Sequence, residues 1–211
     1  MKRRTFLLIA LVLGVVATEP RDASAAPDGG APADTEGGEL SKALTGDASA
    51  LYEIARQAFQ SGDVAAALPK FQRAHEISGD PRLLWNMAAC EAALKHWARA
   101  MTLVDRYLAI GGALLDERDK ERAERFRSAA KRLVATVDVT TAPPGVTVAV
   151  DGEPVGTTPL GSALYLDAGR RRVQFTKTGY RGIVRIEAVS GGAELTWRVG
   201  LERLRIRPLG Q

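Results

Sequence analysis

"VAVDGEPVGTTPL", residues 148–160, is the stretch that decides the fold of the C-terminal part of this chain. A strand of alternating β-branched residues runs into Asp151-Gly152, which is the strongest short signal for a β-hairpin because glycine supplies the positive φ of the turn. Pro154-Val155-Gly156 then begins the returning strand, and "TTPL" ends it with a turn that carries Leu160 into the core. The stretch predicts a hairpin in an all-β domain.

The spacing of Gly152 and Gly156 raises a second interpretation, a loop that cradles phosphate. Such a loop needs converging backbone N–H groups, a lysine, and a following helix whose N-terminus faces the anion. After Gly156 there is neither a lysine nor a helical pattern, and Pro159 interrupts the segment. The structural turn is therefore the favoured interpretation.

Alternation with a period of two continues on both sides of this stretch. It begins at Val134 with "VATVDVT" and ends with "AELTWRVGL", and Gly and Pro turns separate the segments. Short alternating strands at this spacing predict a small antiparallel β-sandwich. We place this domain at residues 133–203 and a basic tail at residues 204–211.

Two longer runs, "APPGVTVAVDGEPVGTTPL" and "LDAGRRRVQFTKTGY", carry a family pattern. The segment from Val137 to Tyr180 resembles the PEGA domain family. Pro-Glu-Gly-Ala itself stands here as Pro143-Pro144-Gly145-Val146. The resemblance implies a small β domain of bacterial surface and envelope proteins, without known catalytic residues. The matching positions are Pro144-Gly145, Asp151-Gly152, Val155-Gly156, Thr158-Pro159, Leu166, Gly169 and Gly179-Tyr180.

An internal repeat occupies residues 48–110. Leu51 aligns with Leu84 and Ala67 with Ala100, at an offset of 33 residues throughout. Each unit combines two stretches of 3.6-residue periodicity around a short break, the signature of helix–turn–helix repeats. A further amphipathic helix from Leu114 would cap the exposed apolar face of the second unit. We place this helical module at residues 47–132.

The spacing resembles that of the tetratricopeptide repeat (TPR) family, with "LLWNMAACEAALKHWARAM" as the better match. The resemblance implies that the first helix of each pair lines a groove for an extended peptide. The alternative is that Trp85 and Phe59 belong to the core or pack on the β domain. The candidate groove residues are Tyr52, Arg56, Phe59, Trp85, Asn86 and Ala89.

A second candidate surface consists of arginines beside the predicted strands. They could face an anionic polymer of the cell wall, or they could be charges that protect a solvated strand edge from aggregation. From Leu133 onward the chain has ten basic and seven acidic residues, a bias too weak to indicate a nucleic-acid partner. The patch comprises Arg170, Arg171, Arg172, Arg181 and Arg185.

The N-terminus has the pattern of an export signal. "MKRR" supplies the positive region, "TFLLIALVLGVVA" the apolar run and "ASAA" the cleavage site, which predicts a signal peptide at residues 1–25. Retention as an anchor and export through the twin-arginine route, suggested by "RRTFLL", remain alternatives. The Ala-, Pro-, Gly- and acid-rich residues 26–46 predict a flexible linker.

Catalytic and metal sites find no support in the pattern. His75 and His96 are far apart in the sequence, no Cys/His cluster has metal spacing, and Asp151 and Glu153 flank the hairpin turn, where we expect them to be solvated. Cys90, the one cysteine, is expected to be a buried apolar residue, with a dimer-linking thiol as the alternative. No cofactor, metal or enzymatic activity is predicted.

Together these features predict an α plus all-β protein that is exported and non-enzymatic. We expect it in the periplasm or envelope of a Gram-negative bacterium, with no stable membrane span after signal cleavage. The main hypothesis is an adaptor or scaffold whose TPR-like groove binds a protein or peptide while the β domain docks to the envelope. The alternative is a carbohydrate- or peptidoglycan-binding protein that acts through the β domain.

Overall fold

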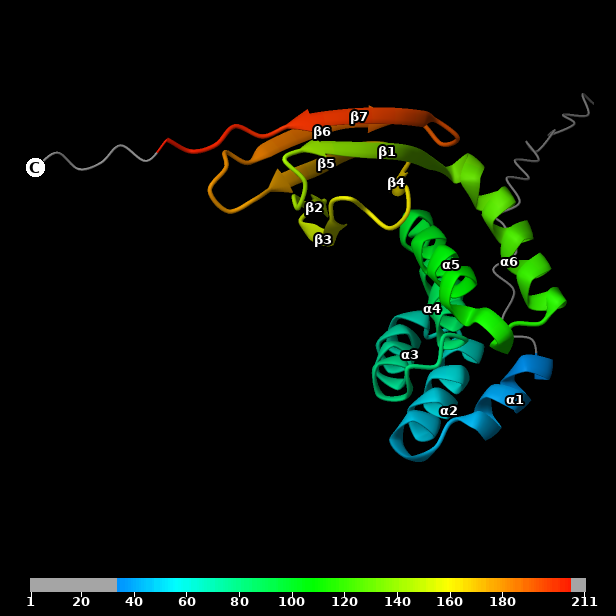
Figure 1. Cartoon of the computed structure of the whole chain (residues 1–211). Helices are drawn as coiled ribbons and strands as arrows, with labels where there is room; N and C mark the ends of the chain where they lie inside the picture. The colour runs from blue at the N-terminus through cyan, green and yellow to red at the C-terminus, as the bar shows by residue number, and fades with distance from the viewer. Residues whose placement is uncertain (1–33, 206–211) are drawn as a thin grey trace, which may run out of the picture.

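The computed structural model describes residues 34–205, and the signal-peptide prediction and most of the basic tail lie outside this range. Helices occupy the N-terminal part of the described chain and strands the C-terminal part (Figure 1), which confirms the predicted fold class of a helical region followed by a β region. Within the described residues, no helix combines the length and apolar character needed to cross a membrane.

The helices follow the predicted repeat. α3 and α5 begin at Val64 and Trp97 respectively, which preserves the offset of the sequence pattern. The Asp63 side chain caps α3 by accepting from the amide of Ala66, and Gly79 ends it with a φ of +68°. The α-helices are α1 (Asp34–Ala43), α2 (Gly46–Gln60), α3 (Val64–Ser78), α4 (Leu83–Ala93), α5 (Trp97–Gly111) and α6 (Glu117–Ala130).

α4 is the central helix of this part, because every residue from Leu83 to Ala92 is buried. Trp85 on α4 packs between Tyr107 of α5 and Phe126 of α6, with ring centroids 5.8 and 6.0 Å away. The predicted capping helix is therefore present as α6, and its apolar face covers the second helix pair. Short 3₁₀ turns at Gly112–Leu114 and Lys131–Leu133 flank it.

The flexible linker predicted at residues 26–46 is wrong for its second half, which contains a helix. α1 occupies Asp34–Ala43 instead, and Leu40 and Leu44 are buried against the helical core. The Ser41 hydroxyl also donates to the Glu53 carboxylate of α2 at 2.6 Å. Two leucines at a spacing of four residues form an apolar stripe that outweighs the local glycine and acidic content.

The strands form two sheets that pack face to face. One sheet has the order β4-β1-β7 and the other the order β3-β2-β5-β6. All pairs are antiparallel except β1 with β7, which run parallel, so the purely antiparallel sandwich that we predicted is corrected at this one pair. The strands are β1 (Val134–Ala142), β2 (Thr147–Val150), β3 (Glu153–Thr157), β4 (Leu164–Asp167), β5 (Gly169–Thr176), β6 (Ile183–Val189) and β7 (Glu194–Gly200).

The hairpin predicted at residues 148–160 is confirmed as β2 and β3. Asp151 and Gly152 both have positive φ, at +51° and +95°, as a two-residue hairpin turn of the primed type requires. Asp151 also accepts from the Arg172 amide and from Arg171 of β5, at 2.9 and 3.0 Å. Although burial opposes it, these donors hold the pKa of Asp151 below its ordinary value.

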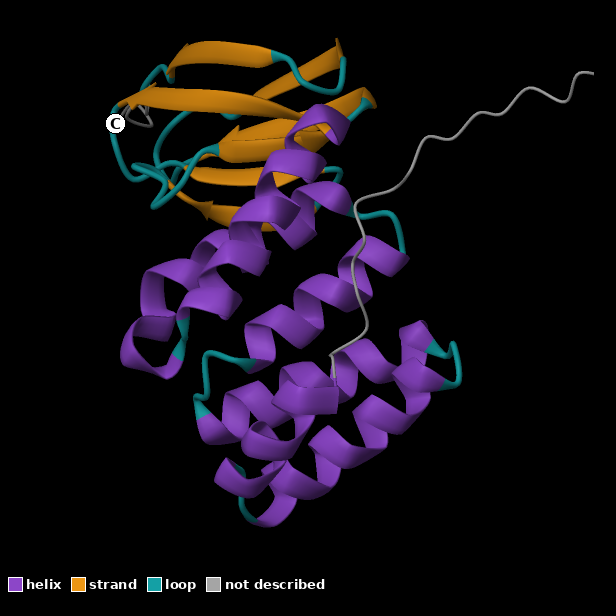
Figure 2. Cartoon of the chain, turned by 90° about the vertical axis from the view of Figure 1, so that its right-hand side faces the viewer, coloured by secondary structure: helices purple, strands orange, loops and turns teal. Residues whose placement is uncertain are grey.

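The β core lies between the two sheets, with Phe175 of β5 and Trp197 of β7 at its centre. The end of α6 leads directly into β1, and the sandwich sits over the ends of α5 and α6 (Figures 1 and 2). The edge strands β3 and β4 lie on the side that faces the helices. This placement creates a space between the two parts of the chain.

Candidate functional site

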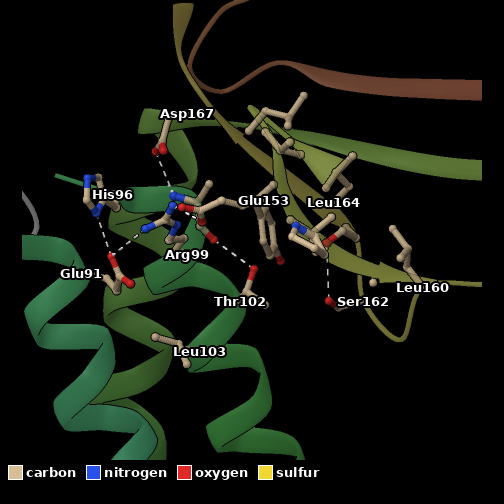
Figure 3. Close-up of a pocket in the computed structure, with 18 of the residues that line it drawn as sticks. Glu91, His96, Arg99, Thr102, Leu103, Glu153, Leu160, Ser162, Leu164 and Asp167 are labelled. Atoms are coloured by element: carbon tan, nitrogen blue, oxygen red, sulfur yellow. Dashed lines mark hydrogen bonds and ion pairs between the residues drawn. The ribbon is translucent and has the colours of Figure 1, made fainter. Parts of the chain in front are cut away.

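A cleft of about 670 Å³ separates the helical part from the β-sandwich (Figure 3). α4 and α5 form one wall, and the hairpin β2–β3 with strand β4 forms the other. Apolar lining residues come from both walls, with Met87 and Leu103 on the helices and Leu160 and Leu164 on the β part. The segment of residues 148–160 thus turns a strand and also lines a cavity, which the sequence pattern did not indicate.

Charged groups at one end of the cleft are paired with one another. The buried Glu91 carboxylate lies 2.8 Å from His96 Nδ1 and 3.9 Å from Arg99. Arg99 also forms an ion pair with Glu153 of the β hairpin, across the cleft. Glu153 is therefore an interdomain contact and not the purely solvated residue that we expected. The carboxylates of Glu91 and Glu153 thus share the guanidinium of Arg99.

The β-sandwich caps a helix of the other part. α5 has no cap from its own N-cap residue, His96. Instead, Asp167 at the end of β4 accepts a hydrogen bond at 2.9 Å from the backbone N–H of Ala98, in the first turn of α5 (Figure 3). A carboxylate at this position satisfies an otherwise orphan amide and faces the positive end of the helix dipole. The cap fixes β4 relative to α5.

We expect Asp167→Ala to lower the free energy of unfolding by about 1 kcal/mol, the usual effect of losing an N-cap side chain. Asp167→Asn should cost less, because an amide oxygen can still accept from Ala98. Urea unfolding followed by circular dichroism measures both effects. Asp138→Ala, at an exposed position on β1, is the matched control. Equal losses for the Asp167→Ala and Asp138→Ala variants would contradict the cap.

A second set of contacts, further along α5, joins this helix to β4 and α6. Tyr165 of β4 donates its hydroxyl to Asp105 of α5 at 2.7 Å. Arg127 of α6 approaches the other oxygen of the same carboxylate at 2.8 Å, an ionic contact without good hydrogen-bond alignment. Burial, and then the hydrogen bond to Asp105, raise the pKa of Tyr165 to about 12. The two walls of the cleft are thus connected at two points on α5, at Ala98 and at Asp105.

The pKa of Tyr165 gives a pH-dependent prediction. Its ordinary value is 10.0 and its folded value about 12, so the stabilisation by neutral Tyr165 is complete below pH 10 and is lost as the pH rises through 12. The difference in unfolding free energy between the wild type and Tyr165→Phe should therefore stay constant up to about pH 10 and fall above it. Urea titrations at several alkaline pH values test this. A difference that stays level to pH 12 would contradict the contact.

The residues predicted to line a TPR-like groove lie mostly in the core. Tyr52, Trp85, Asn86 and Ala89 are all buried, at 1 to 4 % exposure. They do not line an open groove because α1 packs along α2, and because α5 and α6 cover the Trp85 side of α4. Of the other two, Phe59 packs partly against the core, and Arg56 pairs with Glu53 on its own helix.

The predicted arginine patch divides into two groups. Arg170, Arg172 and Arg181 are exposed. Arg171 instead binds Asp151 and the carbonyls of Asp167 and Ala168, and Arg185 lies 4.6 Å above the Trp197 ring and pairs with Glu187. Two of the five arginines therefore have structural partners and are not free cations.

Cys90 and the possible metal ligands were the remaining candidates for a chemical role. Cys90 is buried, and burial, together with the neighbouring Glu91 charge, raises the pKa of its thiol to about 12. Its place in the core supports the expected apolar role. Over residues 34–205, no group of three His, Cys, Asp or Glu side chains is arranged to hold a metal ion.

Comparison with known families assigns the C-terminal part. Residues 134–205 match the PEGA domain, from the first residue of β1 to beyond the end of β7. This confirms the resemblance seen in the hairpin motif. The match does not extend over the helices, whose likeness to TPR repeats stays a prediction. A search of curated proteins found no match to the chain.

Proposed function

We propose that this chain, with its PEGA domain at residues 134–205, is a non-enzymatic exported adaptor of the bacterial envelope. Its partner is an extended protein segment that binds in the cleft between α4–α5 and β3–β4. The observation that carries the proposal is a cavity of about 670 Å³ whose two walls come from different parts of the chain and are tied together. A preformed cleft lowers the ordering cost of binding.

The chemistry of the cleft fits a peptide. β4 is the last strand of its sheet, so it has a neighbour on only one side. An extended chain can pair with such an edge through its backbone while its side chains enter alternate pockets. The Met87, Leu103, Leu160 and Leu164 side chains offer apolar contact. Glu91 and Glu153 place two carboxylates against the one guanidinium of Arg99, which disfavours a strongly acidic segment.

The test uses a variant that fills the cleft without disturbing the core. Thr102 is exposed on α5 and lines the cleft, so Thr102→Trp should occupy the binding space. Affinity purification from the native envelope should recover a protein with the wild type and lose it with Thr102→Trp. Glu121→Trp, at an exposed position of α6 outside the cleft, should retain it. A synthetic peptide from the bound region should then bind purified wild type and bind Thr102→Trp at least about tenfold more weakly.

A second candidate function rests on Arg170, Arg172 and Arg181, which are exposed and form no ion pair with another described residue. These cations suit an anionic cell-wall polymer. Pelleting of the protein with purified cell-wall polymer that is abolished by Arg170→Ala with Arg181→Ala, and unchanged by Thr102→Trp, would favour this alternative over the adaptor.

A further inference from the structure

The edge of the sandwich opposite the cleft has an unpaired strand with exposed apolar side chains. β6 (Ile183–Val189) is the last strand of its sheet, next to β5 only. Val184 and Ile186 on its outer face are 50 and 52 % exposed. A seven-residue edge strand without proline or a bulge presents free backbone groups to another strand. β6 is therefore competent for strand addition, while β3 carries Pro154 and a register shift.

The other face of β6 carries one positive and one negative residue. Arg185 and Glu187 alternate with the exposed residues and point toward β7, where Arg185 lies over Trp197. The Arg185 Nε and a Glu187 carboxylate oxygen are 2.6 Å apart, and the two side chains remain 42 and 34 % exposed. Any strand that adds to β6 will face this pair.

We propose that the partner of this edge is a second copy of the chain, bound as an antiparallel β6–β6 pair around a two-fold axis at Ile186. In this register Arg185 lies directly opposite the partner's Glu187, and Glu187 opposite the partner's Arg185. The symmetry creates both ion pairs at once, because an isologous interface repeats each contact. Val184 falls opposite the partner's Ala188, which joins the apolar outer faces into one strip.

The charges of β6 distinguish this register from the two neighbouring symmetric registers. Centring the pair on Arg185 would place two arginines opposite each other, and centring it on Glu187 would oppose two carboxylates. Like charges directly opposite in a sheet are destabilising, whereas opposite charges stabilise the strand pair. Moving the centre by one residue slips the strands by two residues, so the apolar residues stay on the outer face and the charges decide the register. Centring the pair on Val184 or Ala188 would leave neither charge opposite its counterion, so Ile186 is the centre at which both ion pairs form.

Pairing along β6 would join two four-stranded sheets into one continuous sheet. The clefts remain open in this arrangement because β3 and β4 lie at the opposite edges from β6. The proposed dimer therefore displays two cleft sites facing away from the shared edge. This inference does not depend on what the cleft binds, since it rests on β6 alone.

Charge variants test the register directly. Sedimentation velocity over a wide concentration range should show wild-type dimers, and Arg185→Glu or Glu187→Arg alone should raise the dimer dissociation constant at least about tenfold by opposing like charges at two symmetric positions. Mixing the two variants should restore association as a heterodimer, because each charged position then faces its opposite. The double variant Arg185→Glu with Glu187→Arg should dimerise as well.

A second substitution tests the dimer independently in case the charge variants do not fold. Ile186→Lys places two lysines on the axis at an exposed position, so it should abolish the dimer while its circular dichroism stays that of the wild type. Ile54→Lys, at a helix position that is 50 % exposed, is the matched control and should leave the dimer intact. Monomeric wild type at every concentration, or a dimer that Ile186→Lys leaves unchanged, would overturn the proposal.

Discussion

Replacing Trp85 by alanine should lower the free energy of unfolding by about 3–5 kcal/mol, as expected for truncating a large buried aromatic residue. Trp85 is only 4 % exposed and packs edge-on against Phe126 and at a tilt against Tyr107. The guanidinium of Arg122 lies 4.4 Å above its ring, which adds a cation–π contact. Truncation would remove the link between α4, α5 and α6.

Urea unfolding followed by circular dichroism measures this loss, and Trp85→Phe provides a milder variant if the alanine variant does not fold. Arg56→Ala, at a partly exposed position of the same predicted groove, should cost less than about 1 kcal/mol because its ion pair with Glu53 is accessible to water. If the Trp85→Ala protein is stable but loses a bound partner, Trp85 belongs to a binding groove and not to the core.

Phe175→Ala should destabilise the β core by a similar amount, about 3–5 kcal/mol. Phe175 is fully buried and meets Trp197 of the opposite sheet edge-on at 6.5 Å. The loss should reach the helices too, since β4 supplies the Asp167 cap and the Tyr165 hydroxyl to α5. We therefore expect the helical circular dichroism signal to disappear at a lower urea concentration in this variant.

The matched control is Thr140→Ala on β1, where the side chain is exposed and its removal should change stability little. Hydrogen exchange of the helix and strand amides would show whether both parts lose protection together. An unchanged helical transition in Phe175→Ala would mean that the two parts unfold independently and that the α5 contacts do not couple them.

Local patterns in the sequence were sufficient for the element types. The alternation from Val134 onward and the Asp151-Gly152 turn predicted the strands and the hairpin, because side-chain period and positive φ are local properties. The repeat offset placed α3 and α5 correctly for the same reason. Alternation does not specify which strands pair, so the parallel β1–β7 pair could not be inferred from it.

The candidate site was less accessible to sequence analysis, because its residues meet only after folding. Glu91 and Arg99 lie on the helices, more than fifty residues before Glu153, and Asp167 caps a helix 69 residues away from it in sequence. Periodicity showed that Trp85 occupies one helix face but not that α6 covers that face. Glu91 gave no signal either, since a buried carboxylate in a helical pattern looks like a surface residue.

Site-specific photo-crosslinking tests the central claim, that the cleft holds a partner, most directly. A photoreactive amino acid at Thr102 faces the cleft, and one at Arg170 reports on the exposed arginine surface of the PEGA domain. We expect a discrete protein adduct from position 102, in which the attached residues form one contiguous segment of the partner, and none from position 170. An adduct from position 170 alone, or no protein adduct from position 102, would contradict it.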